Sequence, residues 1–393
     1  MIEFGLLLVV VLALYLMECA VWIPAGSLAF LLCSPLDHSL KLIVRPRPIE
    51  RPSLAFSNPF VPWRAIMVCN PPRIWCSGDG IVSGCADFEQ PSTKNGGNVI
   101  GNFVPFEEIR RLESEGKNLY VNGAKFASLG SEAEATFLAK WLQGLKSRAK
   151  QERAAEIYKE IKRKLAPERA AQVLSYSAQK IYSLGLDCLI LTVATFLAMP
   201  FVVWRWGLSL TWPFLISFMI FNVGLIGWEF HSGQHDLYPQ AKEARWMSMA
   251  MILLSPPAAM RATRYLAKDI AWDFHPLAMA AAAGSKGDFE LLASWFLRDL
   301  TFSAELPVGG NLRAIESATW CRERFRLAVI DLVRKRGLDE TALISPRIRE
   351  SGLVQSYCPR CLCQYTVISG VCEDCGGISL LPHPMKNRGL ANC

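Results

Sequence analysis

Long apolar runs separated by charged stretches dominate the pattern of the chain. The first run extends from Phe4 to Trp22 and reads FGLLLVVVLALYLMECAVW. Two further runs, Leu184 to Trp204 and Leu208 to Trp228, are separated by only three residues. About 20 apolar residues are needed to cross a bilayer core of roughly 30 Å. The pattern therefore predicts an α-helical integral membrane protein with three transmembrane helices, an anchor within residues 1–34 and a hairpin within residues 183–229.

The alternative interpretation of the second and third runs is a buried helical hairpin in a soluble protein. Both runs are almost free of charged residues, which argues against that interpretation. Tryptophans also lie at both ends of the hairpin, namely Trp204, Trp206, Trp212 and Trp228. Because tryptophan is enriched at membrane–water interfaces, these positions favour a transmembrane hairpin.

A fourth apolar stretch, from Met247 to Met260, is too short to cross a bilayer. It also contains Pro256 and Pro257, which interrupt a helix. We expect this stretch to lie at the membrane interface or to pack against the hairpin.

Basic residues are distributed unevenly around the apolar runs. Of the 42 lysines and arginines, all but Arg205 lie within residues 41–180 and 242–388. Basic loops remain in the cytoplasm. The distribution predicts that the N-terminus and the hairpin tip face outward, and that residues 40–180 and 230–393 are cytosolic. The formal net charge of +7 is too weak to indicate nucleic acid as a partner.

The first cytosolic region divides into a linker and a folded module. Residues 35–64 are rich in proline and arginine and predict an extended linker. Residues 65–150 predict a small α+β domain. Its clearest signals are Asn122-Gly123, typical of a β-hairpin turn, and the pair Ser131 and Glu134, which forms a capping box at the start of a helix.

Residues 151–182 predict a basic amphipathic helix next to the membrane. Ile157, Ile161 and Leu165 recur every four residues and form one apolar stripe. One interpretation places this helix on anionic lipid headgroups. The other packs the stripe on the cytosolic domain and leaves the basic face in water. Nucleic-acid binding is disfavoured, because the stretch lacks interleaved aromatic residues that stack on bases.

Residues 230–350 predict a helical cytosolic region that begins with a pair of histidines. His231 and His235 are four residues apart, so a continuous helix would place both imidazoles on one face. This spacing makes them a candidate second metal site and suggests, as an alternative function, an integral-membrane metalloenzyme. The intervening Ser232 and Gly233 weaken the helix between them.

Glu18 lies inside the first apolar run. A carboxylate within a membrane is costly unless it is protonated or paired, so such a residue is a functional candidate. It suggests a third possible function, a small transporter or channel component.

Four cysteines near the C-terminus have the spacing of metal ligands. Cys358 and Cys361 form one Cys-x-x-Cys pair, and Cys372 and Cys375 form a second pair after ten residues. Four thiolates can hold one tetrahedral Zn²⁺ at about 2.3 Å and leave no open coordination position. We therefore predict a structural zinc within residues 355–383, and expect Cys363 to lie outside the ligand set.

The two cysteine pairs flanking a short β-rich segment resemble the zinc-ribbon class over residues 357–381. The resemblance implies a fold but no single function, because zinc ribbons bind nucleic acid, bind partner proteins or cap a domain. The rest of the chain shows no convergent catalytic set. We therefore predict a membrane-anchored scaffold or accessory subunit of a membrane complex, with membrane lipids and partner proteins as its contacts.

Overall fold

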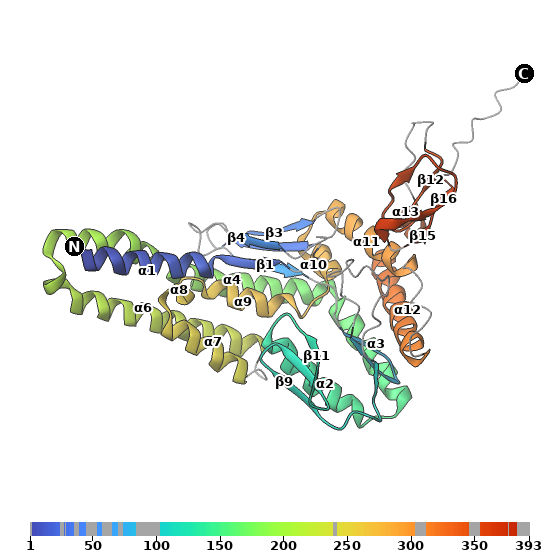
Figure 1. The fold of residues 1–393 in the computed structure, drawn as a ribbon, viewed down its shortest axis with the longest axis horizontal. Helices are drawn as coiled ribbons and strands as arrows, with labels where there is room; N and C mark the ends of the chain where they lie inside the picture. The colour runs from blue at the N-terminus through green and yellow to red at the C-terminus, as the bar shows by residue number, and fades with distance from the viewer. Residues whose placement is uncertain are drawn as a thin grey trace, which may run out of the picture.

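The chain is mostly helical, with several small β-sheets, and is elongated (Figure 1). A helical hairpin forms one end and the cysteine-rich C-terminal segment lies toward the other. The computed structural model describes residues 2–23, 27, 29–34, 39–44, 53–56, 65–69, 74–83, 103–238, 242–302, 312–345, 354–375 and 377–382.

The hairpin consists of two long helical arms. The first arm contains α4 (Pro167–Val193), a π-helical turn (Ala194–Ala198) and α5 (Met199–Trp206). Pro200 lacks the amide hydrogen that an α-helix would use, and the wider turn lies directly before it. Gly207 reverses the chain with φ of +80°, after which α6 (Leu208–Leu237) forms the second arm. The two long apolar helices of the predicted hairpin are present and are joined at Gly207.

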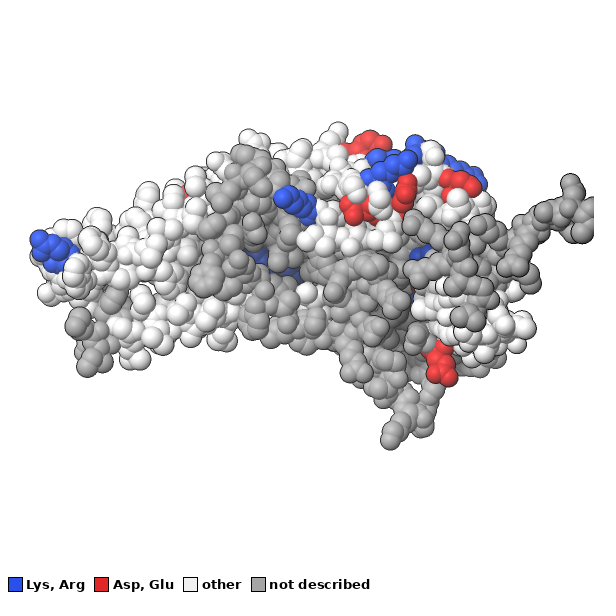
Figure 2. Space-filling view, turned by 90° about the horizontal axis from the view of Figure 1, so that it is seen from above, with Lys and Arg blue, Asp and Glu red and all other residues white. Residues whose placement is uncertain are grey.

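Both arms are long and apolar enough to cross a membrane. Their apolar side chains are largely exposed, for example Leu197 (68 %), Leu210 (72 %) and Ile220 (68 %). A core helix of a soluble protein would bury such residues. The hairpin end of the surface is also almost free of charge (Figure 2).

The first apolar run differs from its prediction. Helix α1 (Ile2–Glu18) has 17 residues and extends about 26 Å at 1.5 Å per residue, less than a bilayer core of roughly 30 Å. The chain then continues as strand β1 (Ala20–Ile23). This strand contains the β-branched Val21 and Ile23, and the helical conformation is disfavoured for Ile23 because it precedes Pro24. Among the described residues, two helices are therefore long and apolar enough to span, and the prediction of three is not confirmed.

The stretch around Pro256 and Pro257 forms a helical turn against the hairpin. Helix α7 (Lys242–Leu254) packs along α6, where a Cβ added at Gly227 would lie 3.0 Å from the Leu253 side chain. Helix α8 (Pro256–Ala259) reverses the chain, and α9 (Ala262–Ala271) returns beside α4 and α6. This agrees with the expected packing against the hairpin.

The region predicted as a linker contributes strands to two sheets. Strand β4 (Ser53–Phe56) pairs antiparallel with β1. Strands β3 (Ser39–Val44), β2 (Ala29–Ser34) and β5 (Ala65–Cys69) form a three-stranded antiparallel sheet in that order. The prolines of the predicted linker lie outside the described residues.

The predicted α+β domain contains two small sheets and one helix. The sheets have the orders β6-β7-β8 and β11-β10-β9. Asn122 and Gly123 both have positive φ in the hairpin turn, as predicted, and Ser131 Oγ accepts from the amide of Glu134 at the start of the helix. Glu134 itself accepts from Gly130 rather than from Ser131. The elements are β6 (Ile74–Cys76), β7 (Gly80–Ser83), β8 (Phe103–Pro105), β9 (Leu112–Glu115), β10 (Asn118–Val121), β11 (Ala124–Ser128) and α2 (Glu132–Lys146).

The basic helix α3 (Lys150–Lys164) ends before Pro167 and is separate from α4. Ile157 and Ile161 are buried in the protein core. Arg163 forms ion pairs with Glu160 and with the buried Asp273, at 2.5 and 2.8 Å. These contacts agree with the interpretation in which the stripe packs on protein. The contact with anionic lipid stays a prediction.

The predicted helical region is a bundle beside α4. Ser285 and Asp288 form a complete capping box at the start of α11, and Gly337, with φ of +70°, follows the end of α12. The helices are α10 (Pro276–Ala283), α11 (Lys286–Thr301), α12 (Leu312–Lys335) and α13 (Glu340–Ile344).

Candidate metal centre

Two small sheets frame the four cysteines. One sheet has the order β13-β12-β16, and the other pairs β14 with β15. The strands are β12 (Ser356–Tyr357), β13 (Gln364–Tyr365), β14 (Val371–Cys372), β15 (Ile378–Ser379) and β16 (Leu381–Pro382). The first Cys-x-x-Cys pair follows β12, and the second pair begins at Cys372, the last residue of β14.

The first turn is a knuckle with backbone hydrogen bonds on both sides. The amide of Leu362 donates to the carbonyl of Cys358, and the amide of Cys358 donates to the carbonyl of Cys363, both at 2.9 Å. Leu362 has φ of +59°, a left-handed conformation that is uncommon for a residue with a side chain. The turn therefore places Cys358 and Cys361 on the same side.

The second turn repeats this arrangement with glycine. The amide of Gly377 donates to the carbonyl of Cys372 at 2.9 Å, and Gly377 has φ of +86°. A 3₁₀ turn, Glu373–Cys375, carries Cys375 back toward Cys372.

The four sulfur atoms lie within 4.8 Å of one another. A tetrahedron with metal–sulfur bonds of about 2.3 Å has edges of about 3.8 Å. The Sγ atoms of Cys361 and Cys372 are 3.8 Å apart. The group can therefore hold one metal ion with little rearrangement. Cys363 lies outside it, as expected from the spacing.

A hydrogen bond between two of the cysteines favours the thiolate form of Cys361 and raises the pKa of Cys375, which donates it. The pKa of Cys361 is lowered to about 4, chiefly by the hydrogen bond that the Cys375 thiol donates to it and also by the Cys363 amide. Burial raises the pKa of Cys358 to about 11, although the amides of Cys361 and Arg360 donate to its sulfur. The Tyr365 hydroxyl donates to Cys372 Sγ at 3.1 Å.

Two arginines connect this centre to the helical bundle. Arg298 of α11 is buried and interacts electrostatically with Cys361 and Cys358. Arg360 lies inside the first knuckle and forms an ion pair with Asp299. Its Nε donates a hydrogen bond to Asp299 Oδ1 at 2.9 Å, and its Nη2 lies 2.6 Å from the same oxygen. Sequence reasoning missed both contacts, because the partners are about 60 residues apart and neither shows a local pattern. A positive charge beside the centre offsets the net charge of about −2 that four thiolates and Zn²⁺ carry.

The histidine pair lies on one face of α6, which continues through Ser232 and Gly233 to Leu237. The His231 and His235 rings are 6.3 Å apart, and His231 lies 5.7 Å from the ring of Trp246. Glu229 accepts a hydrogen bond from Ser183, and Asp236 from Tyr176. Within the described part of the chain, the four cysteines are the one group of three or more potential ligands that gathers this closely.

Glu18 is the last residue of α1 and lies beside the turn into β1. The residue that suggested a transporter or channel is therefore at a helix end rather than in the middle of an apolar helix.

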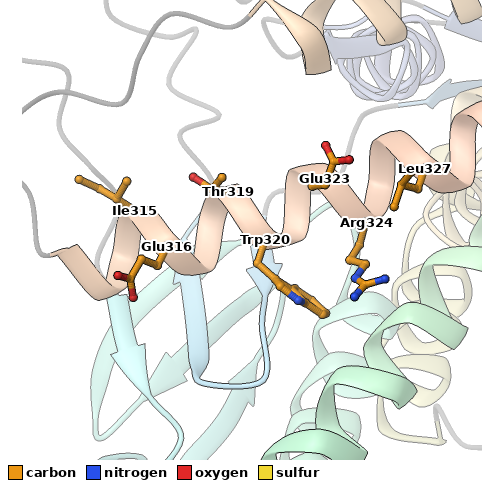
Figure 3. Close-up of a pocket in the computed structure, with 7 residues that line it drawn as sticks. All are labelled: Ile315, Glu316, Thr319, Trp320, Glu323, Arg324 and Leu327. Atoms are coloured by element: carbon orange, nitrogen blue, oxygen red, sulfur yellow. The ribbon is translucent and has the colours of Figure 1, made fainter.

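A groove of about 570 Å³ runs along α12 (Figure 3). Arg324 stacks over the rings of Trp320 and Tyr158, and Glu323 pairs with Arg326 at 2.9 Å. Tryptophan and arginine are the residue types that contribute most to protein interfaces. The groove is lined by Ile315, Glu316, Thr319, Trp320, Glu323, Arg324 and Leu327.

Comparisons of the chain with protein-family models, with curated proteins and with solved structures find no match. The candidate function therefore rests on the geometry of the chain itself.

Proposed function

We propose that this protein is a membrane-anchored scaffold or accessory subunit of a membrane complex, with a zinc ribbon and cytosolic surfaces that bind partner proteins. The observation that carries the proposal is the distribution of exposed apolar side chains. One set covers the hairpin, and a second lies on the ribbon, where Val367, Ile368 and Val371 are exposed. Apolar surface of this kind is typical of membrane or protein contacts.

The hairpin anchors the protein by crossing the bilayer. Trp204 and Trp206 lie near its tip and Trp228 lies toward its base, and all three are exposed, as an aromatic belt at each interface requires. The N-terminus of α1 lies at the same end as the hairpin tip (Figure 1). The basic residues outside the tip favour a cytosolic location for the folded regions, with the N-terminus and tip outside.

The metal at the four cysteines is proposed to be zinc in a structural role. Four sulfur ligands in a tetrahedral arrangement suit Zn²⁺, and a closed ligand set leaves no position for a substrate. The residues that would hold it are Cys358, Cys361, Cys372 and Cys375, and its contribution would be to fold the ribbon.

The ribbon is suited to bind protein rather than nucleic acid. Arg360 is its one basic residue among those described, and it is already paired with Asp299. Glu373 and Asp374 add negative charge. Phosphate contacts require lysine and arginine, so this surface would repel a nucleic-acid backbone. The groove on α12, with Trp320 and Arg324, offers a second surface for a partner.

Purification of native complexes in mild detergent tests the scaffold role. We expect Ile368→Asp, at a side chain that is 70 % exposed, to lose proteins that co-purify with the natural chain. Ile43→Asp is the matched control, because Ile43 is 47 % exposed on β3, away from the ribbon and from the groove on α12. Equal recovery of partners with both variants would argue against the ribbon as a docking surface.

A carbonate wash of membranes tests the anchor separately. An integral protein stays in the membrane pellet because its apolar helices cannot leave the bilayer. Release of the full chain into the supernatant would contradict a spanning hairpin.

A further inference from the structure

Helix α7 carries an apolar face that no described element covers. Met247, Met251 and Leu254 recur at helical spacing and are 61 %, 48 % and 84 % exposed. Trp246 beside them is also exposed. At the other end of the helix, Lys242 is exposed and charged. The helix is therefore polar where it begins and apolar where it ends.

The contacts of α7 fix its direction relative to the hairpin. Near its start, the ring of Trp246 lies 5.7 Å from that of His231. Near its end, Leu253 packs at Gly227, four residues closer to the hairpin tip. At 1.5 Å per residue, α7 thus advances about 6 Å along α6 toward the apolar region.

The turn after α7 lies beside the apolar part of α4. The Cys188 thiol donates to the carbonyl of Ala259 in α8 at 3.2 Å. Helix α9 then runs back, because Leu266 packs at Gly233 and Asp269 accepts a hydrogen bond from Gln234. The α7–α8–α9 segment therefore enters the region beside the hairpin and leaves it on the same side.

We infer that α7 is an interfacial helix whose C-terminal end dips into the lipid leaflet on the side of the folded regions. The inference rests on the proposed membrane hairpin and adds a second lipid contact to it. With 13 residues, α7 extends about 20 Å and cannot span a bilayer core of roughly 30 Å. An interfacial helix buries its apolar face about 5–10 Å into the boundary between headgroups and acyl chains. Met247, Met251 and Leu254 would meet acyl chains, while Lys242 would stay at the headgroups.

Photo-crosslinking in proteoliposomes tests this arrangement. The full chain carries a genetically encoded diazirine amino acid at one position and is reconstituted in phosphatidylcholine with phosphatidylglycerol. Mass spectrometry then distinguishes phospholipid adducts from water adducts. We expect phospholipid adducts at Leu254 and Met251, and mainly water adducts at Lys242.

Ile220 in the middle of α6 serves as the reference for the hairpin itself. Lipid adducts at Ile220 with water or intramolecular adducts at Leu254 and Met251 would overturn the inference and leave the hairpin standing. Water adducts at Ile220 would overturn the spanning hairpin, and with it the premise of the inference. Because Leu254 is highly exposed, the label removes little packing, and an unchanged thermal unfolding midpoint in detergent confirms that each labelled chain is folded.

Discussion

The hairpin and the cysteine ribbon, at opposite ends of the molecule, are both incomplete in water, but for different reasons. The hairpin satisfies its own backbone hydrogen bonds and exposes apolar side chains, such as Leu210 and Ile220. The ribbon exposes a few apolar side chains, and among its described residues the buried hydrophobic cluster consists of Cys358, Cys372, Cys375 and Leu380. Under the proposed function, a lipid bilayer stabilises the hairpin, whereas a metal ion stabilises the ribbon.

This difference concerns where the stabilising free energy originates. Apolar area removed from water contributes about 25 cal/mol per Å², so a lipid phase suffices for the hairpin. A short segment with almost no core cannot offset its ordering entropy in that way. A metal ion can, because apparent zinc binding free energies reach about 10–16 kcal/mol. The two ends should therefore respond independently to loss of metal and loss of lipid.

The largest expected effect is loss of one ligand in Cys372→Ser. We expect zinc to fall from one ion per chain to nearly none, and the ribbon to become sensitive to protease, because metal binding supplies its folding free energy. The hairpin should stay inserted. Elemental analysis and limited proteolysis of the purified chain measure these outcomes. Cys363→Ser is the matched control, since Cys363 lies beside the ligands but outside the set, and it should keep its zinc. Full zinc retention in Cys372→Ser would refute the assignment.

The next largest effect is loss of membrane integration when Ile216→Lys and Ile220→Lys are combined in the hairpin. Both side chains are exposed on one face of α6. In a lipid phase each lysine near the centre of a helix costs roughly 2.5–3.5 kcal/mol, whereas an exposed position in water tolerates it within about 0.5 kcal/mol. We expect a large loss of membrane-integrated protein with unchanged zinc content per folded chain. Leu312→Lys on α12 should have no effect. Normal integration of the double variant would mean that this face does not meet lipid.

The sequence predicted those elements that are determined by residues close together in the chain. Asn122-Gly123 formed the expected turn, and Ser131 capped its helix. The four cysteines gathered as predicted, because each pair is held by its own backbone turn. The two arms of the hairpin were predicted for the same reason, since each is one continuous apolar run.

Contacts between distant residues could not be predicted from one sequence. Strand β1 pairs Ala20 with Phe56, across a region whose prolines suggested an unpaired linker. Arg163 and Asp273 are 110 residues apart, and Arg360 and Asp299 are 61 residues apart. Charged residues are common, so no local pattern identifies these partners. The prediction of a third membrane helix was not confirmed, because hydropathy alone did not reveal the strand that begins at Ala20.

The stability of the helical region between the hairpin tip and the ribbon should depend on pH through Asp269 of α9. Burial raises its pKa to about 6, although Gln234 donates a hydrogen bond that opposes the shift. The ordinary value is about 3.9, so the folded state binds this proton more tightly than the unfolded state. The resulting stabilisation is present below about pH 4 and is lost as pH rises through about 6, with a total of at most about 3 kcal/mol.

Thermal unfolding in detergent at pH 5 and pH 7 measures this contribution. Relative to Asp269→Asn, which does not titrate, the natural chain should lose stability between these two values. The comparison of the two chains cancels contributions from other carboxylates and from the metal ligands. An identical pH dependence in both would show that Asp269 does not carry the shift.

The smallest expected effect is that of Leu362→Gly, which tests how much backbone strain at this position weakens zinc binding. Leu362 holds φ of +59°, which costs roughly 1–2 kcal/mol for a residue with a Cβ. Glycine removes that cost but loses about 0.5–1 kcal/mol of unfolded-state entropy. The net gain should be at most about 1.5 kcal/mol, or up to about tenfold tighter zinc in competition with a chelator. Leu362→Ala keeps the strain and should bind no tighter than the natural chain.

The second knuckle supplies the reciprocal test of the same idea. Gly377 holds φ of +86° with open space around its Cα, so Gly377→Ala adds strain without a steric clash. We expect weaker zinc binding in Gly377→Ala and tighter binding in Leu362→Gly, both measured on the full chain in detergent. If Leu362→Gly instead weakened zinc as much as Leu362→Ala, the side chain of Leu362 would matter more than its backbone angle. The ribbon would then depend on side-chain packing as well as on the ion. Its source of stability would differ less from that of the hairpin than the small buried core of the ribbon suggests.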